Sequence, residues 1–440
     1  MPASSAVIYP TTNLTATEQL IIERGEGVYV YDNQGKQYLE GMSGLWCTGL
    51  GYGNQELIDT ISDQLSKLSF THMFGGKSHQ PGIDLANKLA DMVPVKEARV
   101  FFGNSGSDAN DTHIKLLRYY ANAIGKPGKR KIITRERGYH GVTVAAGALT
   151  TLPANRTHFD APLEALGILQ TDHPHYYRGA QGEETEAQFV ERITANLEQL
   201  IIDEGPDTIA AFIAEPITGA SGVIVPPEGY YQKVQAILKK YDILFWADEV
   251  INGFGRTGKT FGCETMGIDA PDQMTFAKQL SSAYFPISAS VISGKLYEPM
   301  VAASDEVGVF GHGYTYSGHP VGCAAALKTL EIYERDEIYA HAAQMGDYLQ
   351  ARLATLAEHE RVGEVRGAGL IAAVELVDDK TTRAPALDMT QRAAQLCQDH
   401  GLIVRAVAGC SLAVCPPLII SREQVDELVD KLSLSINQAA

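Results

Sequence analysis

The stretch "QMTFAKQLSS", residues 273–282, places a lysine directly after an apolar run that is typical of a buried strand. An ammonium group without a partner in an apolar site is costly, so such a group usually changes its pKa, pairs with a carboxylate or reacts covalently. Lys278 is therefore a candidate functional residue. The run before it is also the starting point for the fold, because similar runs recur along the chain.

Two further apolar runs end in an ionisable residue in the same way. They are "TIAAFIAE", which ends at Glu215, and "ILFWAD", which ends at Asp248. Segments with helical spacing, such as "YYQKVQAILKKY" at 230–241, alternate with these runs. This alternation is typical of βαβ units and predicts a mostly parallel sheet covered by helices. Ligands bind outside the carboxyl ends of such strands, so we expect Glu215, Asp248 and Lys278 to lie together there.

The chain has 440 residues, more than the roughly 250–300 that one hydrophobic core usually supports. After about residue 325 the pattern changes to amphipathic helices and strands with polar flanks. Residues 27–40, "GVYVYDNQGKQYLE", read as a hairpin whose turn is Asn33 to Gly35. We predict an α/β protein with a large domain over 51–325 and a smaller α+β domain formed by 1–50 and 326–440.

Composition excludes several classes of protein. The net charge of −17 argues against nucleic-acid binding, which needs a concentrated excess of Lys and Arg. No apolar run approaches the roughly 18 residues of a membrane span, and the N-terminus lacks the pattern of a signal peptide. We therefore expect a cytoplasmic protein without a membrane partner. The six cysteines are scattered without CxxC pairs, which fits reduced thiols better than disulfides or zinc.

The segment "FFGNSGSDAN", residues 101–110, sets Ser105, Gly106 and Ser107 where a strand turns into a helix. Such a turn exposes backbone N–H groups and the positive end of the helix dipole, so it can hold a phosphate. It lacks the GK[ST] of a P-loop and the GxGxxG of a dinucleotide site. A phosphate cradle together with Asp248 and Lys278 suits pyridoxal phosphate, with Lys278 as Schiff-base residue and Asp248 on the pyridine nitrogen.

The ordered motifs resemble those of the class III pyridoxal-phosphate-dependent aminotransferases of fold type I. The resemblance runs from about residue 23 to residue 420. It rests on motifs in the order and at the spacing of that family: "NSGSDAN", "YHG", "AEPITGASGVIVPP", "ADEVINGFGRTG" with "FAKQL" beyond it, and "HGYTYSGHPVGCAAAL".

The resemblance implies a role for each matched residue. Lys278 forms the Schiff base and moves the proton, Asp248 holds the pyridine nitrogen, Tyr139 and Val250 face the two sides of the ring, and Thr315 reaches in from a second subunit. The implied partner is thus a second copy, in a homodimer or a tetramer. Arg256 matches a motif position but is interpreted as structural. The full implied cofactor-binding set is Ser105, Gly106, Ser107, Tyr139, His140, Glu215, Asp248, Val250, Lys278 and Thr315.

Departures from the family pattern point to a subgroup. Members that act on ornithine, acetylornithine or 4-aminobutyrate carry an Arg where this chain has Ala413, and often a Glu where it has Ala220. Arg405 instead stands where amine:pyruvate transaminases, the ω-transaminases, have a mobile arginine that can pair a carboxylate. In that subgroup Trp46 and Phe74 match the wall and rim of the substrate pocket, which Tyr139 also lines.

The resemblance therefore implies an ω-transaminase that moves an amino group from a primary amine or ω-amino acid to pyruvate by a ping-pong mechanism, giving alanine and an aldehyde or ketone. A pyruvate transaminase specific for a polyamine such as putrescine, for taurine or for β-alanine is the nearest alternative. A diaminopelargonate-type enzyme is disfavoured, because it usually has paired aromatics where this chain has "LW". An aminomutase or decarboxylase on the same scaffold stays open. A non-catalytic module is disfavoured, because both Lys278 and Asp248 are present.

Overall fold

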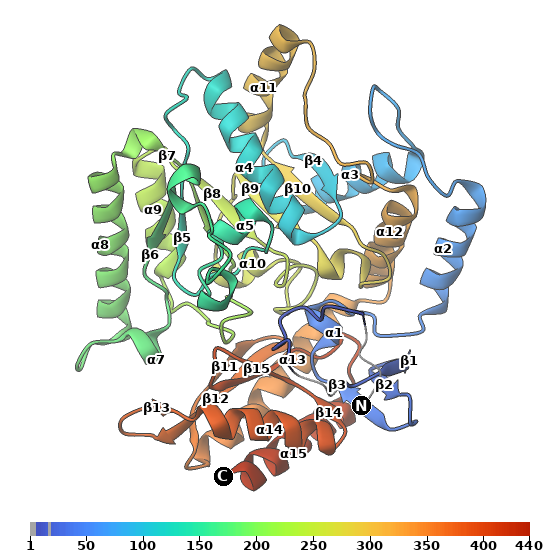
Figure 1. The fold of residues 1–440 in the computed structure, drawn as a ribbon, viewed down its shortest axis with the longest axis vertical. Coiled ribbons are helices and arrows are strands. Elements are labelled where there is room, and N and C mark those ends of the chain that lie inside the picture. Colours follow the sequence, from blue (N-terminus) through green and yellow to red (C-terminus); the bar gives the residue numbers. More distant parts are fainter. Residues whose placement is uncertain (1–5, 16–18) are drawn as a thin grey trace.

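A seven-stranded sheet forms the centre of the chain, whose computed structural model describes residues 6–15 and 19–440. Its strand order is β4-β10-β9-β8-β7-β5-β6. Figure 1 shows the sheet in the upper of two lobes, with helices around it. The strands are β4 (Arg99–Gly103), β5 (Lys131–Arg135), β6 (Ile168–Thr171), β7 (Ile209–Ala214), β8 (Leu244–Asp248), β9 (Gln273–Phe276) and β10 (Ser288–Ile292).

The sheet is mostly parallel, which confirms the prediction. β5, β6, β7, β8 and β9 pair in parallel, whereas β10 runs antiparallel to both β4 and β9. Every residue of β7, β8 and β9 is buried. These strands are covered on both faces, which is why they read as continuous apolar runs and not as alternating ones.

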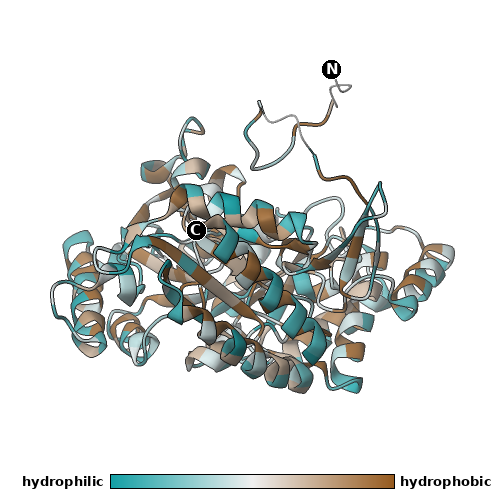
Figure 2. Ribbon diagram, turned by 90° about the horizontal axis from the view of Figure 1, so that it is seen from below, coloured by the Kyte–Doolittle hydropathy of each residue, from teal (hydrophilic) through white to brown (hydrophobic). Residues whose placement is uncertain are grey.

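Helices pack around the central sheet, with α4 on β9 and β10, α9 on β8 and α8 on β6. Figure 2 shows that many of these helices carry both hydrophilic and hydrophobic residues, as expected for helices that bury one face. The helices and short helical turns of this part of the chain are α1 (Ser43–Trp46), α2 (Gln55–Lys67), α3 (Gln80–Met92), α4 (Gly106–Ala123), α5 (Val144–Leu149), η1 (Pro153–Asn155), α6 (Leu163–Leu166), α7 (Tyr176–Gly179), α8 (Glu186–Glu204), η2 (Pro206–Thr208), α9 (Tyr230–Lys240), α10 (Gly262–Met266), η3 (Lys278–Ser281), α11 (Gly294–Val307) and α12 (Pro320–Arg335).

The second lobe combines C-terminal elements with the N-terminal strands. One of its sheets has the order β11-β12-β16-β15, with β13 paired to β12, and the other has the order β1-β2-β3-β14. Its elements are β1 (Ile22–Glu26), β2 (Tyr29–Asp32), β3 (Gln37–Glu40), α13 (Ile338–Ala354), η4 (Thr355–Glu358), β11 (Val362–Ala368), β12 (Ile371–Asp379), β13 (Ala384–Pro385), α14 (Leu387–Asp399), β14 (Leu402–Ile403), β15 (Arg405–Val407), β16 (Ser411–Val414) and α15 (Arg422–Ala439).

The predicted hairpin near the N-terminus is present as β2 and β3, with Tyr29 opposite Leu39. β3 also pairs in parallel with β14, so the two ends of the chain share a sheet. α12 runs without interruption from Pro320 to Arg335, so a boundary at 325/326 falls inside a helix. The division into 1–50, 51–325 and 326–440 stays a prediction.

An ion-pair network ties the two lobes together. His175 and Arg178, at α7, bond to Glu364 and Glu375 of β11 and β12. Arg366 bonds to both of those carboxylates. His175, Glu364 and Glu375 offer ligand atoms within 4.8 Å of one another. Because the carboxylates already face two arginines, we interpret this cluster as an ion-pair network.

Among residues 6–15 and 19–440, no helix is both long enough and apolar enough to cross a membrane. All six cysteines lie in this part of the chain and all are free thiols.

Candidate active site

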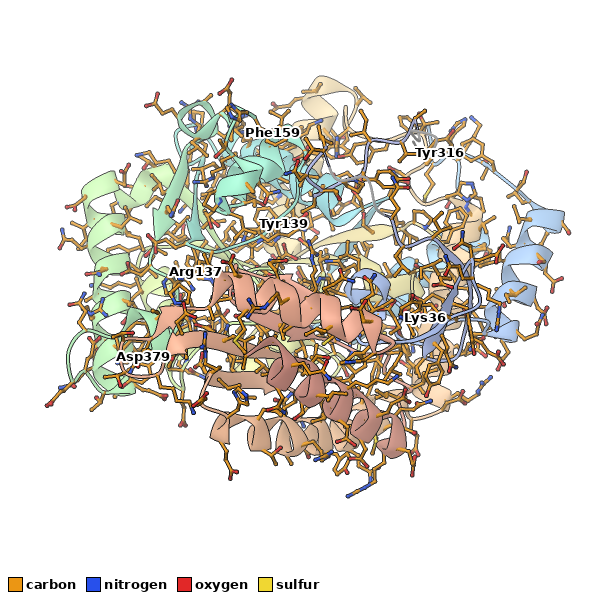
Figure 3. The ribbon with its side chains drawn as sticks, turned by 60° about the horizontal axis from the view of Figure 1, so that its bottom comes forward. Lys36, Arg137, Tyr139, Phe159, Tyr316 and Asp379 are labelled. Atoms are coloured by element: carbon orange, nitrogen blue, oxygen red, sulfur yellow. The ribbon has the colours of Figure 1, made fainter. Side chains whose placement is uncertain are left out.

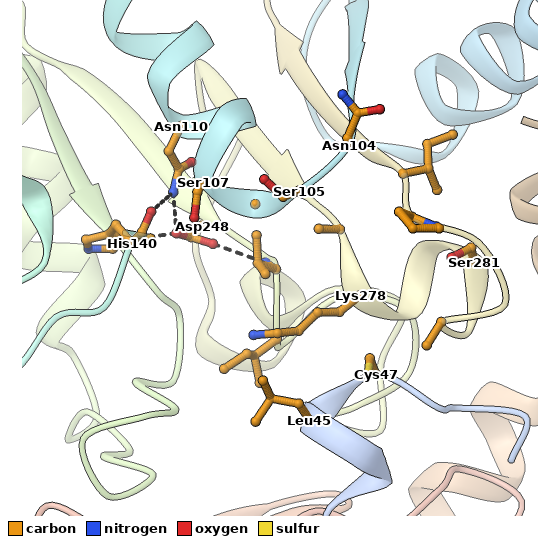
Figure 4. Close-up of a pocket in the computed structure, with 18 of the residues that line it drawn as sticks. Leu45, Cys47, Asn104, Ser105, Ser107, Asn110, His140, Asp248, Lys278 and Ser281 are labelled. Carbon is orange, nitrogen blue, oxygen red and sulfur yellow. Dashed lines mark hydrogen bonds and ion pairs between the residues drawn. The ribbon is translucent and has the colours of Figure 1, made fainter. Parts of the chain in front are cut away.

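The carboxyl ends of β7, β8 and β9 meet at one edge of the sheet, as the sequence predicted. Asp248 is the last residue of β8, Glu215 follows β7 directly, and Lys278 lies two residues beyond β9. All three line one cavity of about 360 Å³, which Figure 4 shows in close-up. The cavity is also lined by most of the other residues of the predicted cofactor-binding set: Ser105, Gly106, Ser107, Tyr139, His140 and Val250.

Asp248 is only 3% exposed and accepts three hydrogen bonds. His140 Nδ1 and Asn110 Nδ2 donate to Oδ2 over 2.8 and 3.0 Å, and the Val250 amide donates to Oδ1 over 3.1 Å. Burial raises the pKa of Asp248, but the His140 hydrogen bond and charge, with the other two donors, lower it more, so the pKa lies below its ordinary value. The structure therefore holds a carboxylate anion against the cavity.

Lys278 begins η3 with a positive φ of 44°, a conformation that is unfavourable for a residue with a side chain. The next residue anchors this turn. Gln279 Nε2 donates to the Gly253 carbonyl over 2.9 Å, and its Oε1 accepts from the buried Arg256 over 3.3 Å. Tyr333 donates to the Gln279 carbonyl over 3.2 Å. A buried polar network thus fixes the strained backbone that aims Lys278 into the cavity.

The Lys278 amine has no hydrogen-bond partner among the residues that the structure describes. Burial lowers the pKa of Lys278, and the nearby groups Cys47, Asp248 and Glu215 offset that effect only in part. An amine with a lowered pKa is more often neutral near pH 7, which is the form that can act as nucleophile or base.

Glu215 also lines the cavity and fixes the loop that carries Tyr139. Its Oε1 accepts from the Tyr139 amide over 3.1 Å, and its Oε2 accepts from the Gly219 amide over 2.9 Å. Burial raises the pKa of this carboxyl above its ordinary value. The Glu215 carbonyl accepts from the buried side chains of Arg135 and Tyr231, so the whole strand end is held in place.

The start of α4 forms another wall of the cavity. Ser105 and Asp108 make a capping box, in which Ser105 Oγ accepts from the Asp108 amide and the Asp108 carboxylate accepts from the Ser105 amide. The amides of Gly106 and Ser107 make no hydrogen bond within the described residues and remain available at this helix end. A Cβ at Gly106 would lie 3.1 Å from Val250, so the close approach favours glycine.

Four predicted residues do not line this cavity in the single chain. Thr315 is exposed, and Phe74 is 47% exposed beside a separate groove formed by residues 73–87 and 309–317. Figure 3 shows Tyr316, the neighbour of Thr315, well apart from the central Tyr139. Trp46 is 1% exposed and packs in a hydrophobic cluster with Met42 and Ile251. The roles assigned to these residues stay predictions.

Arg405, the fourth of these residues, lies on β15 and is half-buried. Burial raises the pKa of Tyr139, which lines the cavity, and the positive charge of Arg405 acts against that effect, so the two side chains lie within electrostatic range of each other. The Arg405 guanidinium makes no hydrogen bond or ion pair within residues 6–15 and 19–440.

Sequence reasoning missed several residues of the site. Asn110 lies one helical turn after Gly106 on α4, and this spacing of four is the signal that could have revealed it. Leu45 and Cys47 line the cavity, whereas Trp46 between them was the predicted pocket residue. A backbone with positive φ at Ser43, Gly44 and Trp46 turns those side chains, and no sequence pattern indicates it.

The residues of the cavity fit pyridoxal phosphate. The buried, anionic Asp248 suits a protonated ring nitrogen, the free amides at the start of α4 and the small Gly106 suit a phosphate, and Lys278 suits an aldehyde. Tyr139 and Val250 supply a flat and an apolar surface for a ring.

Comparisons with known proteins agree with this chemistry. Residues 12–436 match the family Aminotransferase class-III. The chain is 47% identical over 421 residues to gamma aminobutyrate transaminase 3, chloroplastic, of Solanum lycopersicum, covering 95% of this chain and 80% of that protein.

Solved structures are similar over almost the whole chain. The omega transaminase from Pseudomonas jessenii in complex with PMP has a TM-score of 0.96 at 49% identity, covering 98% of this chain and 96% of that one. A thermostable omega transaminase variant engineered for asymmetric synthesis of enantiopure bulky amines, with one Trp, one Phe and one Arg replaced, has a TM-score of 0.96 at 48% identity, covering 98% and 97%. The chain belongs to the class-III aminotransferases, which use pyridoxal phosphate.

Proposed function

We propose that this aminotransferase is an ω-transaminase that moves the amino group of a primary amine or ω-amino acid to pyruvate, giving alanine and an aldehyde or ketone. The observation that carries the proposal is Arg405, a guanidinium without an ionic partner in the described chain and within electrostatic range of Tyr139, which lines the cavity. Such a group can pair with the carboxylate of pyruvate and move aside for a neutral amine.

In this proposal the inner wall of the cavity holds the cofactor. Asp248 would accept a hydrogen bond from the protonated ring nitrogen, and the amides of Gly106 and Ser107 would bind the phosphate with the hydroxyls of Ser105 and Ser107. Tyr139 and Val250 would enclose the ring, Glu215 would face its phenolic side, and His140 would act through its hydrogen bond to Asp248. Pyridoxal phosphate, when bound, supplies an aldehyde that takes up the amino group and a ring that stabilises negative charge at the reacting carbon.

Lys278 binds the cofactor in the resting enzyme and then moves the proton. With cofactor and amine bound, its Nζ would take the proton from the carbon that bears the amino group and would return that proton on the cofactor side. The lowered pKa of Lys278 favours the neutral amine that this step needs. The keto product leaves before pyruvate enters, so the kinetics are ping-pong.

A comparison of residue types supports the assignment of the substrate wall. The Trp, Phe and Arg that are replaced in the engineered omega transaminase stand at the same spacing along that chain as Trp46, Phe74 and Arg405 stand here. That variant is described as engineered for bulky amines. We propose that these three residues bound the substrate space in this protein too.

A 4-aminobutyrate:pyruvate transaminase is the second candidate, because the plant relative is named for that substrate. Ala413 and Ala220 argue against a fixed carboxylate clamp for the donor at those two positions. Under this second proposal Arg405 would bind the donor carboxylate and the pyruvate carboxylate in turn. The polyamine, taurine and β-alanine alternatives differ only in the donor and are resolved by the same experiment.

We also propose that the active form is a homodimer, or a tetramer built from it. Val309 and Tyr316, near Thr315 in sequence, and Phe70 and Phe74, from a distant segment, have exposed side chains. The two segments meet, because the ring centroids of Phe70 and Tyr316 lie 5.7 Å apart and a Cβ on Gly313 would touch the Phe74 ring at 2.7 Å. Contiguous exposed apolar surface is typical of an interface. A second copy on this face would bring its Thr315 and Phe74 to the cavity of its partner. Ile8 and Leu14 are exposed on the N-terminal segment, which lies away from the rest of the chain in Figure 2. A second copy would also bury these two side chains.

The visible spectrum of the purified protein tests the proposal. We expect a yellow band from bound pyridoxal phosphate that bleaches with 1-phenylethylamine or putrescine and returns with pyruvate as alanine forms in equal amount. Bleaching by 4-aminobutyrate alone would favour the second candidate, and bleaching by taurine or β-alanine alone would identify those donors. Loss of the donor's carboxylate as CO₂, or no transfer to pyruvate, would contradict a transaminase of this type.

A further inference from the structure

A chain of buried hydrogen bonds runs behind Asp248. Trp246 Nε1 donates to Thr275 Oγ1 over 2.8 Å, Thr275 Oγ1 donates to Asn110 Oδ1 over 2.8 Å, and Asn110 Nδ2 donates to Asp248 Oδ2 over 3.0 Å. Trp246 and Thr275 are fully buried, and Asn110 is 1% exposed. The chain links β8, β9 and α4, and it ends at the carboxylate that faces the cavity.

The direction of this chain is fixed by the chemistry of its first member. An indole N–H can only donate, so the Thr275 hydroxyl accepts from Trp246 and its own hydrogen goes to Asn110. The amide oxygen of Asn110 is thereby occupied, so its NH₂ group must point at Asp248 and at the His140 carbonyl, which accepts over 2.7 Å. The amide cannot turn over without leaving two buried groups unpaired.

A neutral histidine packs beside this chain of hydrogen bonds and adds no charge to it. The His113 ring packs against Trp246 with ring centroids 4.8 Å apart, and its Nε2 bonds to the Met274 carbonyl. Burial lowers the pKa of His113 to about 4, so the ring is neutral at physiological pH. The packing of the His113 ring helps to hold the Trp246 indole in place. The fold therefore fixes the NH₂ group of Asn110 as the donor to Asp248.

As a result, the two carboxylate oxygens of Asp248 accept different numbers of hydrogen bonds. Oδ2 accepts from both Asn110 and His140, whereas Oδ1 accepts only from the Val250 amide. Figure 4 shows the bonds from Asn110 and His140 meeting on one side of the Asp248 carboxylate. A carboxylate oxygen can accept two hydrogen bonds, so Oδ1 keeps one acceptor position free.

We propose that Asn110, oriented by Thr275 and Trp246, is a positioning residue that occupies Oδ2 of Asp248 and leaves Oδ1 as the acceptor for the ring nitrogen of pyridoxal phosphate. This inference rests on the proposed role of Asp248. It predicts that Thr275, which touches neither cofactor nor substrate, affects how strongly the protein recognises that one nitrogen.

The experiment compares the apo protein's affinity for pyridoxal phosphate with its affinity for the analogue in which a C–H replaces the ring nitrogen. The ratio of the two dissociation constants reports on the ring nitrogen alone, because the phosphate and aldehyde are the same in both ligands. Thr275→Val removes the hydroxyl at constant shape, Thr275→Ser retains it, and Asn110→Ala removes the donor to Asp248. Thr194→Val, which removes a buried hydroxyl bonded to the Val190 carbonyl in α8, is the matched control.

We expect the wild type to prefer pyridoxal phosphate, and Thr275→Val to reduce that preference roughly three- to tenfold, the effect of one hydrogen bond. Asn110→Ala should reduce it at least as much, while Thr275→Ser and Thr194→Val should retain it. A general loss of packing would weaken both ligands equally and leave the ratio unchanged, so an unchanged ratio in Thr275→Val overturns the inference even if that variant is less stable.

The same measurement separates this inference from the one on which it rests. A wild type that binds both ligands equally would overturn the proposed role of Asp248 itself. A wild type that discriminates, together with a Thr275→Val variant that discriminates as well, would retain Asp248 and overturn only the positioning role of Asn110 and Thr275.

Discussion

The inner and outer walls of the cavity are built in different ways. The inner wall comes from the ends of β7, β8 and β9 and the start of α4, and its carboxylates are satisfied within one chain. The outer wall includes Leu45 and Cys47, whereas its predicted members Arg405, Phe74 and Thr315 do not line the cavity of the single chain. The wall assigned to the cofactor is thus complete, and the wall assigned to the substrate is not.

The difference has a physical reason. A buried ionisable group such as Asp248 is tolerated only when fixed donors surround it, and strand and helix ends provide such donors. A substrate wall has to admit and release different molecules, so it is built from loops and movable side chains. Leu45 illustrates this, because it is 53% exposed next to the cavity on a segment with positive φ at Ser43, Gly44 and Trp46.

We expect the largest effect from a substitution in the inner wall, at Lys278. Lys278→Ala removes both the covalent attachment and the base, so turnover should fall by about 10⁴-fold or more. The visible band of the bound cofactor should shift as the attachment is lost. Steady-state kinetics with added pyridoxal phosphate measure the effect, and turnover within tenfold of the wild type would contradict the role of Lys278.

The next effect comes from Asp248. Asp248→Asn places an NH₂ group among the donors of His140, Asn110 and the ring nitrogen, so we expect kcat to fall by roughly 10²–10³-fold, the effect of losing one fixed electrostatic contact to the reacting system. Glu249→Gln is the control, because Glu249 is equally buried but accepts from the amides of Gly262 and Cys263. The control should alter stability and leave kcat within a few-fold of the wild type.

The outer wall is tested at Arg405. Arg405→Ala should raise the KM for pyruvate by roughly ten- to a hundredfold, the value of a charge-assisted contact, and change the KM for a neutral amine only slightly. Half-reaction kinetics with each substrate give the two constants separately. Equal losses for pyruvate and for the amine would show that Arg405 supports the fold and does not select the carboxylate.

The proposed contribution of a second subunit is tested at Thr315. Thr315→Asp sets a carboxylate against the cofactor phosphate and should weaken cofactor binding about tenfold or more. Chains with Lys278→Ala and chains with Thr315→Asp should regain activity when they are unfolded together and refolded, because one site of each mixed dimer then contains both native residues. No recovery, with mixed dimers shown by mass spectrometry, would place Thr315 in its own chain's site or in neither.

We expect the smallest effect from the titration of Glu40, which supports the outer wall. This carboxyl accepts from the Met42 amide over 3.1 Å just before the segment Ser43–Cys47, and burial raises its pKa to about 7. Between about pH 4.5 and 7 the folded chain holds a proton that the unfolded chain has released. The contribution of this bound proton to the free energy of unfolding is fully present below about pH 4.5, and it is lost as the pH rises through about 7.

Urea unfolding at one protein concentration measures this loss. Between pH 5.5 and 7.5 the wild type should lose roughly 1–3 kcal/mol of unfolding free energy relative to Glu40→Gln, which cannot titrate. Glu56→Gln is the control, since the hydrogen bond from Arg335 holds the pKa of Glu56 below its ordinary value and outside this range. Parallel pH profiles for the wild type and Glu40→Gln would show that Glu40 titrates normally.

The sequence predicted most of the inner wall because local patterns determine it. Apolar runs that end in Glu215, Asp248 and, two residues past β9, Lys278 fix three side chains at one sheet edge once the strands are parallel. The small residues 105–107 at the start of α4 follow from the same logic. Asn110 was missed because its spacing of four from Gly106 indicates only that the two residues share a helix face, and its partners Thr275 and Asp248 come from distant strands.

By itself, then, the sequence determined the α/β fold and the meeting of Glu215, Asp248 and Lys278 at one sheet edge, since apolar runs and their spacing encode strands and their ends. Its ordered motifs, by their resemblance to a known family, indicated the class-III aminotransferases. Only the tertiary structure decided that Trp46 is buried while Leu45 faces the cavity, that Arg405 approaches Tyr139, and that Phe74 and Thr315 lie away from the site of their own chain. These features depend on contacts between segments far apart in sequence, and on backbone conformations that no local pattern specifies.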